Sequence, residues 1–594
     1  MCESGKKKHF FDIRYLVPGI LLFLPLTAYP LLWQKIWTAH VPFWGEVQTI
    51  SLPVMGLCAS GALCFAPERF KKFWMIGRFR FFLIFAIAGI GVAFLQKLLF
   101  GGPETYIFTA GFFFLLPVAG MLFSAELKRL FPWFAAAVFF PAVIVTCRSG
   151  DFSGWAGNWN WNFSLLTISF TGLFFLCGTR NFSRKALTAL GCSVGGLILI
   201  SLFQPAIAPR GTFAGLIAAT VCVIGFRHIQ PARRWAFALW AGALTLILFT
   251  GSLGNILEKI RDSRLQLWRG SFDAALAHFP LGIGFDRFES FINPYLPELY
   301  YFTPYAATRH PHPHNEFLNY TVSYGLVGAV FFILLILLLL RGLRYRDKLG
   351  MYLAWSVLLL AVHGQFDVLL GMPLTGTWFL LGSGAVIGNG LSKRPCFSAQ
   401  TSWKKIFKTA GMIFFFSAFL LALKCGQSTW FFRRARLALM QQDPVTARKY
   451  LKKSLQKYIS PNALYTAGAV ELFNFRNPDG AVEHLRRISD DLGLPMVYHS
   501  NALLARAYAV RGEYVRAINC FDRELQNYPL SALASGLRLS VLKQIQADSK
   551  NINEETIRFH ALMKLRNLKP EELPVLLKNQ LLDDAPLKMQ EDDQ

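Results

Sequence analysis

One stretch decides the fold class: Phe317-Leu-Asn-Tyr-Thr-Val-Ser-Tyr-Gly-Leu-Val-Gly-Ala-Val-Phe-Phe-Ile-Leu-Leu-Ile-Leu-Leu-Leu-Leu340. It has no charged side chain, and its 24 residues exceed the about 20 that a helix needs to cross a hydrocarbon core. About twelve similar stretches make the full set 16–33, 47–66, 81–100, 106–125, 131–147, 163–178, 186–204, 212–226, 235–251, 317–340, 350–370, 373–390 and 409–425. Because a helix satisfies its own backbone polar groups in lipid, the sequence predicts an all-α, polytopic membrane protein with about 12 to 13 transmembrane helices.

The composition excludes a soluble single-domain enzyme. Hydrophobic residues make up 54% of the 594 residues, and the mean hydropathy is +0.37. Charged residues make up 16%, against about 25% in an ordinary soluble domain. The ten cysteines show no CxxC spacing of the kind found in zinc or redox sites, so the sequence predicts neither a disulfide framework nor a zinc site built on cysteine.

The net charge of +26 is concentrated in alternate loops between the predicted spans. About 26 Lys and Arg lie in one set of loops, and about 3 lie in the short loops of the other set. Because cytoplasmic loops retain basic residues, the N-terminus is predicted to be cytoplasmic. An odd number of spans then places the region after residue 425 outside, together with the long loop 252–316. The basic balance therefore indicates membrane orientation and not nucleic-acid binding.

After residue 425 the composition becomes that of a soluble helical domain with a weak internal repeat. Small residues recur at Ala447, Ala481 and Ala517, in steps of 34 and 36 residues, and a larger residue follows each of them one turn later. Small residues let the two helices of a hairpin approach closely. The segment from Ala505 to Phe521 most clearly resembles tetratricopeptide repeats, and a generic domain of helical hairpins is the alternative.

The densest polar chemistry lies at the end of the long loop, in Thr308-Arg-His-Pro-His-Pro-His-Asn-Glu316. Prolines alternate with His310, His312 and His314 and favour an extended chain, in which side chains at i and i+2 share a face. Such spacing is compatible with a metal site, although only Glu316 is a nearby carboxylate and no cysteine completes the set. A general base or proton shuttle at the membrane surface is a second interpretation, and a solvated histidine-rich loop is a third.

Five short motifs follow one another between about residues 205 and 375: Pro209-Arg-Gly-Thr212, Arg264-Leu-Gln-Leu-Trp268, Pro280-Leu-Gly-Ile-Gly-Phe285 with Phe288, His314-Asn-Glu-Phe-Leu318 with Gly325-Leu-Val-Gly328, and His363-Gly-Gln-Phe-Asp367 with Pro373. In this order and membrane context they resemble the O-antigen ligase superfamily, in which a His-Asn pair stands at the outer end of a helix. One residue departs from the family pattern. At Ser323 many relatives carry an acidic side chain.

The resemblance implies a membrane glycosyltransferase that moves a glycan from an undecaprenyl-pyrophosphate carrier to an acceptor hydroxyl on the outer face. The chain contains no Walker loop and no DxD motif, as expected for a lipid-linked donor. By this resemblance His314 is the base that deprotonates the acceptor, and Asn315 orients the ring or the sugar. His312, His363 and Asp367 are supporting residues, and neither a metal nor another cofactor is expected.

A pyrophosphate leaving group needs cationic donors with several N–H groups, which guanidinium supplies better than ammonium. The candidates are Arg210 and Arg264, with Arg309 third, although arginines at a helix mouth also reach toward lipid phosphate. The aromatic run Trp155-Ala-Gly-Asn-Trp-Asn-Trp-Asn162 could stack on sugars, but a place in the interfacial aromatic belt is favoured.

The predicted division is into N-terminal transmembrane helices (1–204), a ligase-like catalytic membrane region (205–425) and a periplasmic tetratricopeptide-like domain (426–594). The resemblance implies that the protein lies in a bacterial inner membrane.

The identity of the acceptor stays open among lipid A-core, a growing glycan in an O-antigen polymerase and a protein hydroxyl in a protein O-oligosaccharyltransferase. The repeats are a peptide-binding type of surface that could take a protein acceptor or an assembly partner. The competing class is a non-enzymatic transporter or scaffold of envelope glycan assembly, which the scarcity of ionisable residues within the spans disfavours.

Overall fold

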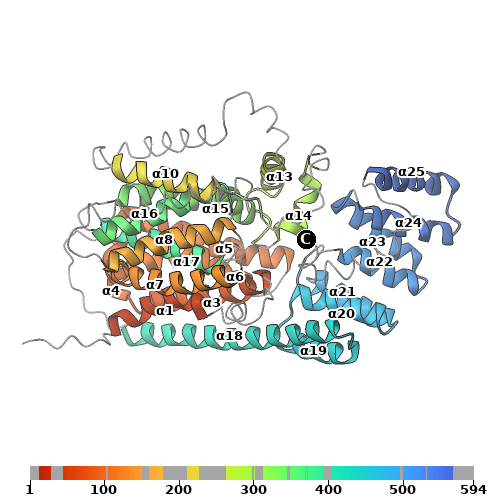
Figure 1. Cartoon of the computed structure of the whole chain (residues 1–594), viewed down its shortest axis with the longest axis horizontal. Helices are drawn as coiled ribbons and strands as arrows, with labels where there is room; N and C mark the ends of the chain where they lie inside the picture. Colours follow the sequence, from red (N-terminus) through yellow and green to blue (C-terminus); the bar gives the residue numbers. More distant parts are fainter. Residues whose placement is uncertain are drawn as a thin grey trace, which may run out of the picture.

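The computed structural model describes the chain as a set of helices (Figure 1). The described residues are 13–27, 44–101, 105–149, 159–177, 210–225, 263–285, 287–297, 300, 312–343, 348–367, 369–370, 372–391, 404–494, 499–529 and 531–565. Within these ranges the secondary structure is entirely helical, which confirms the predicted all-α class. The predicted spans 186–204 and 235–251 lie outside the described residues.

The helical bundle is built from elements that cover most of the predicted spans. They are α1 (Ile13–Thr27), α3 (Trp44–Cys64), α4 (Pro67–Trp74), α5 (Gly77–Phe100), α6 (Thr105–Leu122), α7 (Ser124–Ser149), α8 (Trp159–Cys177), α10 (Arg210–Gly225), α15 (Glu316–Gly342), α16 (Lys348–His363), α17 (Pro373–Leu391) and α18 (Lys404–Met440). Among the described residues, five stretches are long and apolar enough to cross a membrane: Gly77–Phe100, Thr105–Leu122, Ser124–Ile144, Glu316–Gly342 and Ile406–Met440. Shorter apolar helices, such as Leu349–His363, accompany them. The chain is therefore a multi-pass membrane protein by length and composition of its helices.

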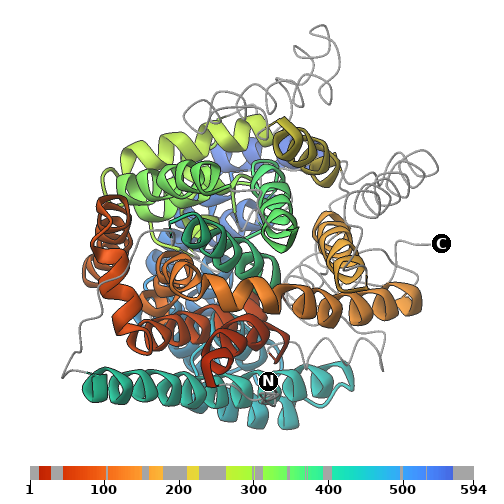
Figure 2. The same ribbon diagram turned by 90° about the vertical axis from the view of Figure 1, so that its left-hand side faces the viewer.

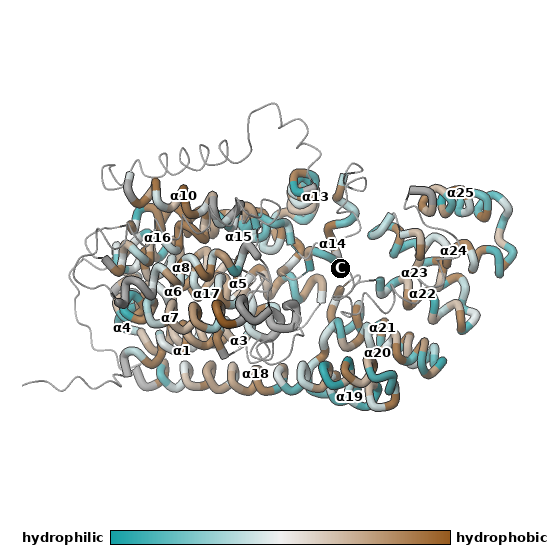
Figure 3. Tube along the Cα trace, viewed as in Figure 1, coloured by the Kyte–Doolittle hydropathy of each residue, from teal (hydrophilic) through white to brown (hydrophobic). Residues whose placement is uncertain are grey.

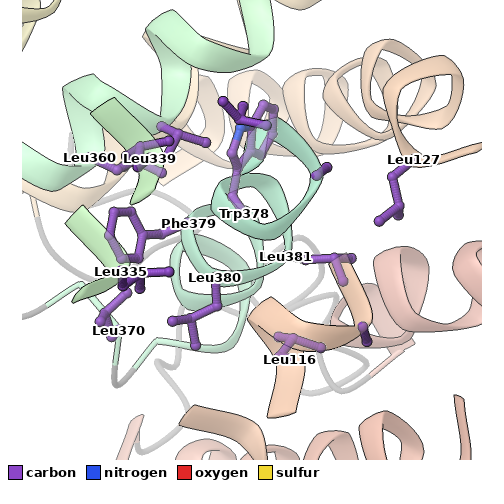
Figure 4. Packing of buried hydrophobic residues seen from close by; sticks show 14 of the residues in the cluster. Leu116, Leu127, Leu335, Leu339, Leu360, Leu370, Trp378, Phe379, Leu380 and Leu381 are labelled. Carbon is purple, nitrogen blue, oxygen red and sulfur yellow. The ribbon is translucent and has the colours of Figure 1, made fainter. Parts of the chain in front are cut away.

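Helix α17 forms the centre of the bundle. Its side chains are buried almost along its whole length, and it packs against α6, α7, α15 and α16. Leu335, Leu360 and Trp378 belong to the apolar cluster around it (Figure 4). Close approach to α6 depends on glycine, because a Cβ atom at Gly384 would stand 2.0 Å from the carbonyl oxygen of Pro117. The core thus fixes the positions of the helices that carry the polar residues described below.

Two helices end elsewhere than the hydropathy predicts. Helix α16 stops at His363, seven residues before the predicted end, and a turn over 364–367 follows. At Gly364 a Cβ atom would stand 2.9 Å from the Cγ atom of Glu316, so α15 leaves no room there for a larger residue.

Helix α18 continues past the predicted end at 425 to Met440. The predicted domain boundary at 425 and 426 therefore falls inside one continuous helix.

Helix α18 connects the bundle to the C-terminal helices. Its 37 residues give a length of about 55 Å, more than the about 30 Å of a hydrocarbon core. It runs along one edge of the bundle in both views (Figures 1 and 2). Its first part is mostly hydrophobic, whereas its last part and the helices that follow it mix hydrophilic and hydrophobic residues (Figure 3). The helix therefore extends beyond the apolar bundle into the C-terminal region.

The C-terminal helices pack as consecutive antiparallel neighbours: α18 with α19 (Pro444–Lys457), α20 (Pro461–Phe473) with α21 (Pro478–Asp490), α22 (Ser500–Val510) with α23 (Tyr514–Asn527), and α24 (Ala532–Gln544) with α25 (Ser549–Leu565). The predicted small residues Ala447, Ala481 and Ala517 are completely buried. These contacts show a C-terminal helical region, whereas its tetratricopeptide character stays a prediction.

Candidate active site

The turn between α16 and α17, His363-Gly-Gln-Phe-Asp367, is the centre of the site. The His363 carbonyl oxygen accepts hydrogen bonds from the main-chain N–H groups of Phe366 at 2.9 Å and Asp367 at 3.1 Å. These bonds close the turn and fix Asp367 relative to the last residue of α16. The carbonyl groups of residues 364 to 366 are then directed toward other elements.

The start of α15 binds this turn through its main chain and one amide. The Glu316 N–H donates to the Gly364 carbonyl at 2.7 Å, and the Asn315 Nδ2 group donates to the Gln365 carbonyl at 3.0 Å. The Asn315 Oδ1 atom accepts from the N–H of Leu318 at 2.9 Å and caps the helix. Asn315 therefore ties the N-terminus of α15 to the turn, a positioning role that adds to the one predicted for it.

His314 and Asp367 form a hydrogen-bonded pair although 53 residues separate them in the chain. The distance between His314 Nδ1 and Asp367 Oδ1 is 3.1 Å. His314 has φ +53°, a left-handed conformation that is uncommon for residues other than glycine. Asp367 is 3% exposed. Burial opposes ionisation of this carboxyl, but the hydrogen bond from His314 and the charges of the neighbouring histidines outweigh burial and lower the pKa of Asp367 below its ordinary value.

His312 lies beside this pair. Its ring centroid is 4.5 Å from that of His314 and 6.5 Å from that of Trp161. Trp161 is buried, because α8 begins at Trp159 and carries it into the site. The prediction that this tryptophan belongs to an interfacial aromatic belt is therefore wrong.

Three side chains of the site could bind a metal ion. One donor atom each from His312, His314 and Asp367 lies within 4.8 Å of the others. Zinc holds such atoms at about 2.0 to 2.2 Å, so neighbouring ligands of one tetrahedral ion stand about 3.3 Å apart. The set would have to contract around an ion. Its carboxylate is Asp367, whereas Glu316 was the nearby carboxylate in the sequence; His310 lies outside the described residues.

Helix α13 (Ser263–Ala277) holds the turn and the histidine segment together. The exposed Arg264 donates from Nη1 to the Phe366 carbonyl at 3.1 Å, and Trp268 Nε1 donates to the Pro313 carbonyl at 2.9 Å. Arg264 therefore lies at the predicted site. Arg210 is the first residue of α10, where only its main chain is described, and Arg309 lies outside the described residues.

The glycine motif packs against a kink in α15. The N–H groups of Ile283 and Gly284 donate to the carbonyls of Val322 at 2.8 Å and Ser323 at 3.0 Å. Gly325 leaves the helical conformation with φ +59°, and a Cβ atom there would stand 1.9 Å from the Pro280 carbonyl oxygen. Glycine is therefore required for this approach, and the contact joins two of the predicted motifs.

A buried hydroxyl pair completes the site on the side of α8 and α10. Ser164 Oγ lies 2.6 Å from His363 Nδ1 and 3.0 Å from Thr212 Oγ1. All three side chains have no exposed surface. The sequence predicted a supporting role for His363 but no role for Ser164, because a single serine in an apolar stretch has no local signal of such a contact.

A comparison with protein families finds one similarity, which covers part of the chain. Residues 170–333 match the family model described as O-Antigen ligase, a segment that includes Arg264, His312 and His314. No curated protein and no solved structure gives a significant match. His363 and Asp367 follow the matched segment and are joined to it by the contacts above. Residues 170–333 are therefore similar to the O-antigen ligase family.

Proposed function

We propose that this protein transfers a glycan from undecaprenyl pyrophosphate to an acceptor hydroxyl, with His314 as the general base. The observation that carries the proposal is the hydrogen bond between His314 and the buried Asp367 carboxylate next to the matched ligase segment. A histidine whose Nδ1 atom is held by a carboxylate presents Nε2 to a substrate and is stabilised when it becomes charged.

In the proposed reaction, His314 takes the proton of the acceptor hydroxyl as the oxygen attacks the anomeric carbon. The new carbon–oxygen bond forms while the bond to pyrophosphate breaks, and the electron pair leaves with undecaprenyl pyrophosphate. Attack from the opposite side inverts the anomeric centre. Asp367 stays ionised and stabilises the imidazolium. General base catalysis of this kind contributes about 10²- to 10⁴-fold to a rate.

The leaving pyrophosphate is proposed to bind Arg264, Arg210 and Arg309. Arg264 is exposed, and its anchor on the Phe366 carbonyl places it at the turn that carries Asp367. A guanidinium group offers five N–H donors, so one main-chain contact leaves capacity for phosphate oxygens. Base and cationic group are thereby brought together by a single turn.

We expect the reaction to need no metal ion. Dialysis against a chelator should leave glycan transfer within about twofold of the untreated protein, because proton removal and charge stabilisation are both assigned to side chains. Transfer is measured with a lipid-linked glycan before and after chelation. Loss of activity that added zinc restores would contradict this expectation and assign His312, His314 and Asp367 to a metal site.

The acceptor is lipid A-core, a growing glycan or a protein hydroxyl, so the activity is that of a ligase, a polymerase or a protein O-oligosaccharyltransferase. The C-terminal region contacts the bundle, since Thr105 Oγ1 at the start of α6 lies 3.1 Å from the Tyr458 hydroxyl. We assign to these helices a role in binding the acceptor or a partner protein. Mass spectrometry of all products formed with a lipid-linked glycan tests the function. Absence of glycosylated products in all three acceptor classes would favour the alternative function of a transporter or scaffold.

We further propose that the site and the C-terminal region face the periplasm of a bacterial inner membrane. A reporter enzyme that folds only in the periplasm should be active when fused after residue 441, directly beyond α18, because basic loops stay cytoplasmic. The same reporter fused after residue 400, in the basic segment that follows α17, should be inactive. The reverse pattern would overturn the topology.

A further inference from the structure

We infer that Ser164 and Thr212 are positioning residues that hold the Asp367 turn in place through His363. The inference rests on the proposed function, because it assigns a task in that reaction to two hydroxyls for which the sequence predicted no role. Ser164 lies on α8, Thr212 on α10 and His363 at the end of α16, so the two short contacts connect three helices.

The ring of His363 depends on this contact. Its Nε2 atom is buried without a hydrogen-bond partner among the described residues, and its Nδ1 atom lies 2.6 Å from Ser164 Oγ. Removal of the serine hydroxyl would therefore leave a buried imidazole without a hydrogen-bond partner for either nitrogen in the part of the chain that the structure describes. Such a group is unfavourable in an apolar interior, so we expect the ring to shift.

A shift of His363 reaches Asp367 through the main chain. The His363 carbonyl accepts the N–H groups of Phe366 and Asp367, and Asp367 in turn holds His314. Thr212 connects the same chain to α10 two residues after Arg210. The hydroxyl pair thus sets the distance between base and carboxylate without contact to either of them.

Other hydroxyls on α8 provide a matched control. Ser169 is equally buried, and the structure gives its hydroxyl hydrogen bonds to the carbonyls of Leu165 and Leu166, within its own helix. Bonds of this kind satisfy the hydroxyl locally and connect no helices. Substitution of either serine by alanine removes the same atom from the same helix, but only Ser164 is connected to His363.

The test compares steady-state kinetics of the full-length protein in its membrane or detergent. Ser164→Ala should lower kcat about tenfold with the KM for the lipid-linked donor changed by less than about twofold, because the base and not donor binding is disturbed. Thr212→Val should lower kcat several-fold, Thr212→Ser should restore it, and Ser169→Ala should match the wild type. In an Asp367→Asn background, Ser164→Ala should have almost no further effect, since both act on the same pair.

The outcomes separate this inference from the proposed function. An active wild type with unchanged kcat in Ser164→Ala would overturn the inference and leave the function intact. A loss of equal size in Ser169→Ala, or a full additional loss in the Asp367→Asn background, would assign Ser164 to stability alone and also overturn it. A wild type without transfer activity on any acceptor class would overturn both.

Discussion

Replacement of His314 by alanine should abolish glycan transfer, with kcat lowered by about 10²- to 10⁴-fold. The imidazole is the group assigned to proton removal, and its loss would also remove the hydrogen bond to the Asp367 carboxylate. His314→Gln is the sharper variant, because the amide can still donate to the carboxylate but cannot accept a proton. Initial rates with a lipid-linked glycan measure the effect, and the amount of protein in the membrane is measured alongside.

A second histidine of the same loop region provides the control. His278 Nε2 lies 3.1 Å from the Tyr295 hydroxyl, a contact outside the site, and burial lowers the pKa of this imidazole. His278→Ala should keep transfer within about twofold of the wild type, since surface-loop contacts away from a site have small effects. Full activity of His314→Ala at normal protein level would refute the assignment of the base.

The membrane helices were predictable because their signal is local. An apolar stretch such as 317–340 specifies a helix across lipid whatever its neighbours are, and α15 confirms it. The end of α16 at His363 was not predictable in this way, because Phe366, Leu369 and Leu370 continue the apolar pattern. The helix stops where Glu316 at the start of α15 binds the turn that follows: its N–H donates to the Gly364 carbonyl at 2.7 Å, and its carboxylate accepts the N–H of Leu370 at 2.5 Å. No window along the sequence contains that contact.

The end of α18 shows the opposite error. Charged residues after 425 mark the limit of the apolar segment, and the hydropathy pattern predicts a helix end there, whereas α18 continues to Met440. A helix satisfies its backbone hydrogen bonds equally well in water, so it can leave the membrane without interruption. Hydropathy therefore locates the membrane surface better than it locates helix ends.

The site was predictable as a set of motifs but not as a geometry. The family resemblance brought His314, Arg264, His363 and Asp367 into one list, and the structure places all four around one turn. The resemblance could not show which of these side chains contact one another, because each motif is defined only by the spacing of its own residues. Ser164 carries no motif at all, and only the packing of α8 against α16 reveals it.

Asp367→Asn should lower kcat by about 10²- to 10⁴-fold while the KM for the donor changes little, the second large effect expected for this protein. The amide keeps the size of the side chain but carries no charge to stabilise the imidazolium, and it allows His314 to hold its proton on the wrong nitrogen. Asp367→Glu keeps the charge and displaces it, so an intermediate rate is expected. Wild-type activity in Asp367→Asn would exclude the pair from the mechanism.

The pH dependence of stability gives an independent check on the same carboxylate. Because the folded protein holds the pKa of Asp367 below its ordinary value, the ionised carboxylate stabilises the fold above about pH 4, the ordinary value, and this stabilisation is lost only as pH falls through the lowered pKa. The difference in thermal unfolding temperature between wild type and Asp367→Asn should therefore decrease as the pH falls below about 4. A difference that stays the same down to about pH 2 would mean that ionisation of Asp367 does not stabilise the fold, and it would remove the support for a carboxylate held in its charged form beside His314.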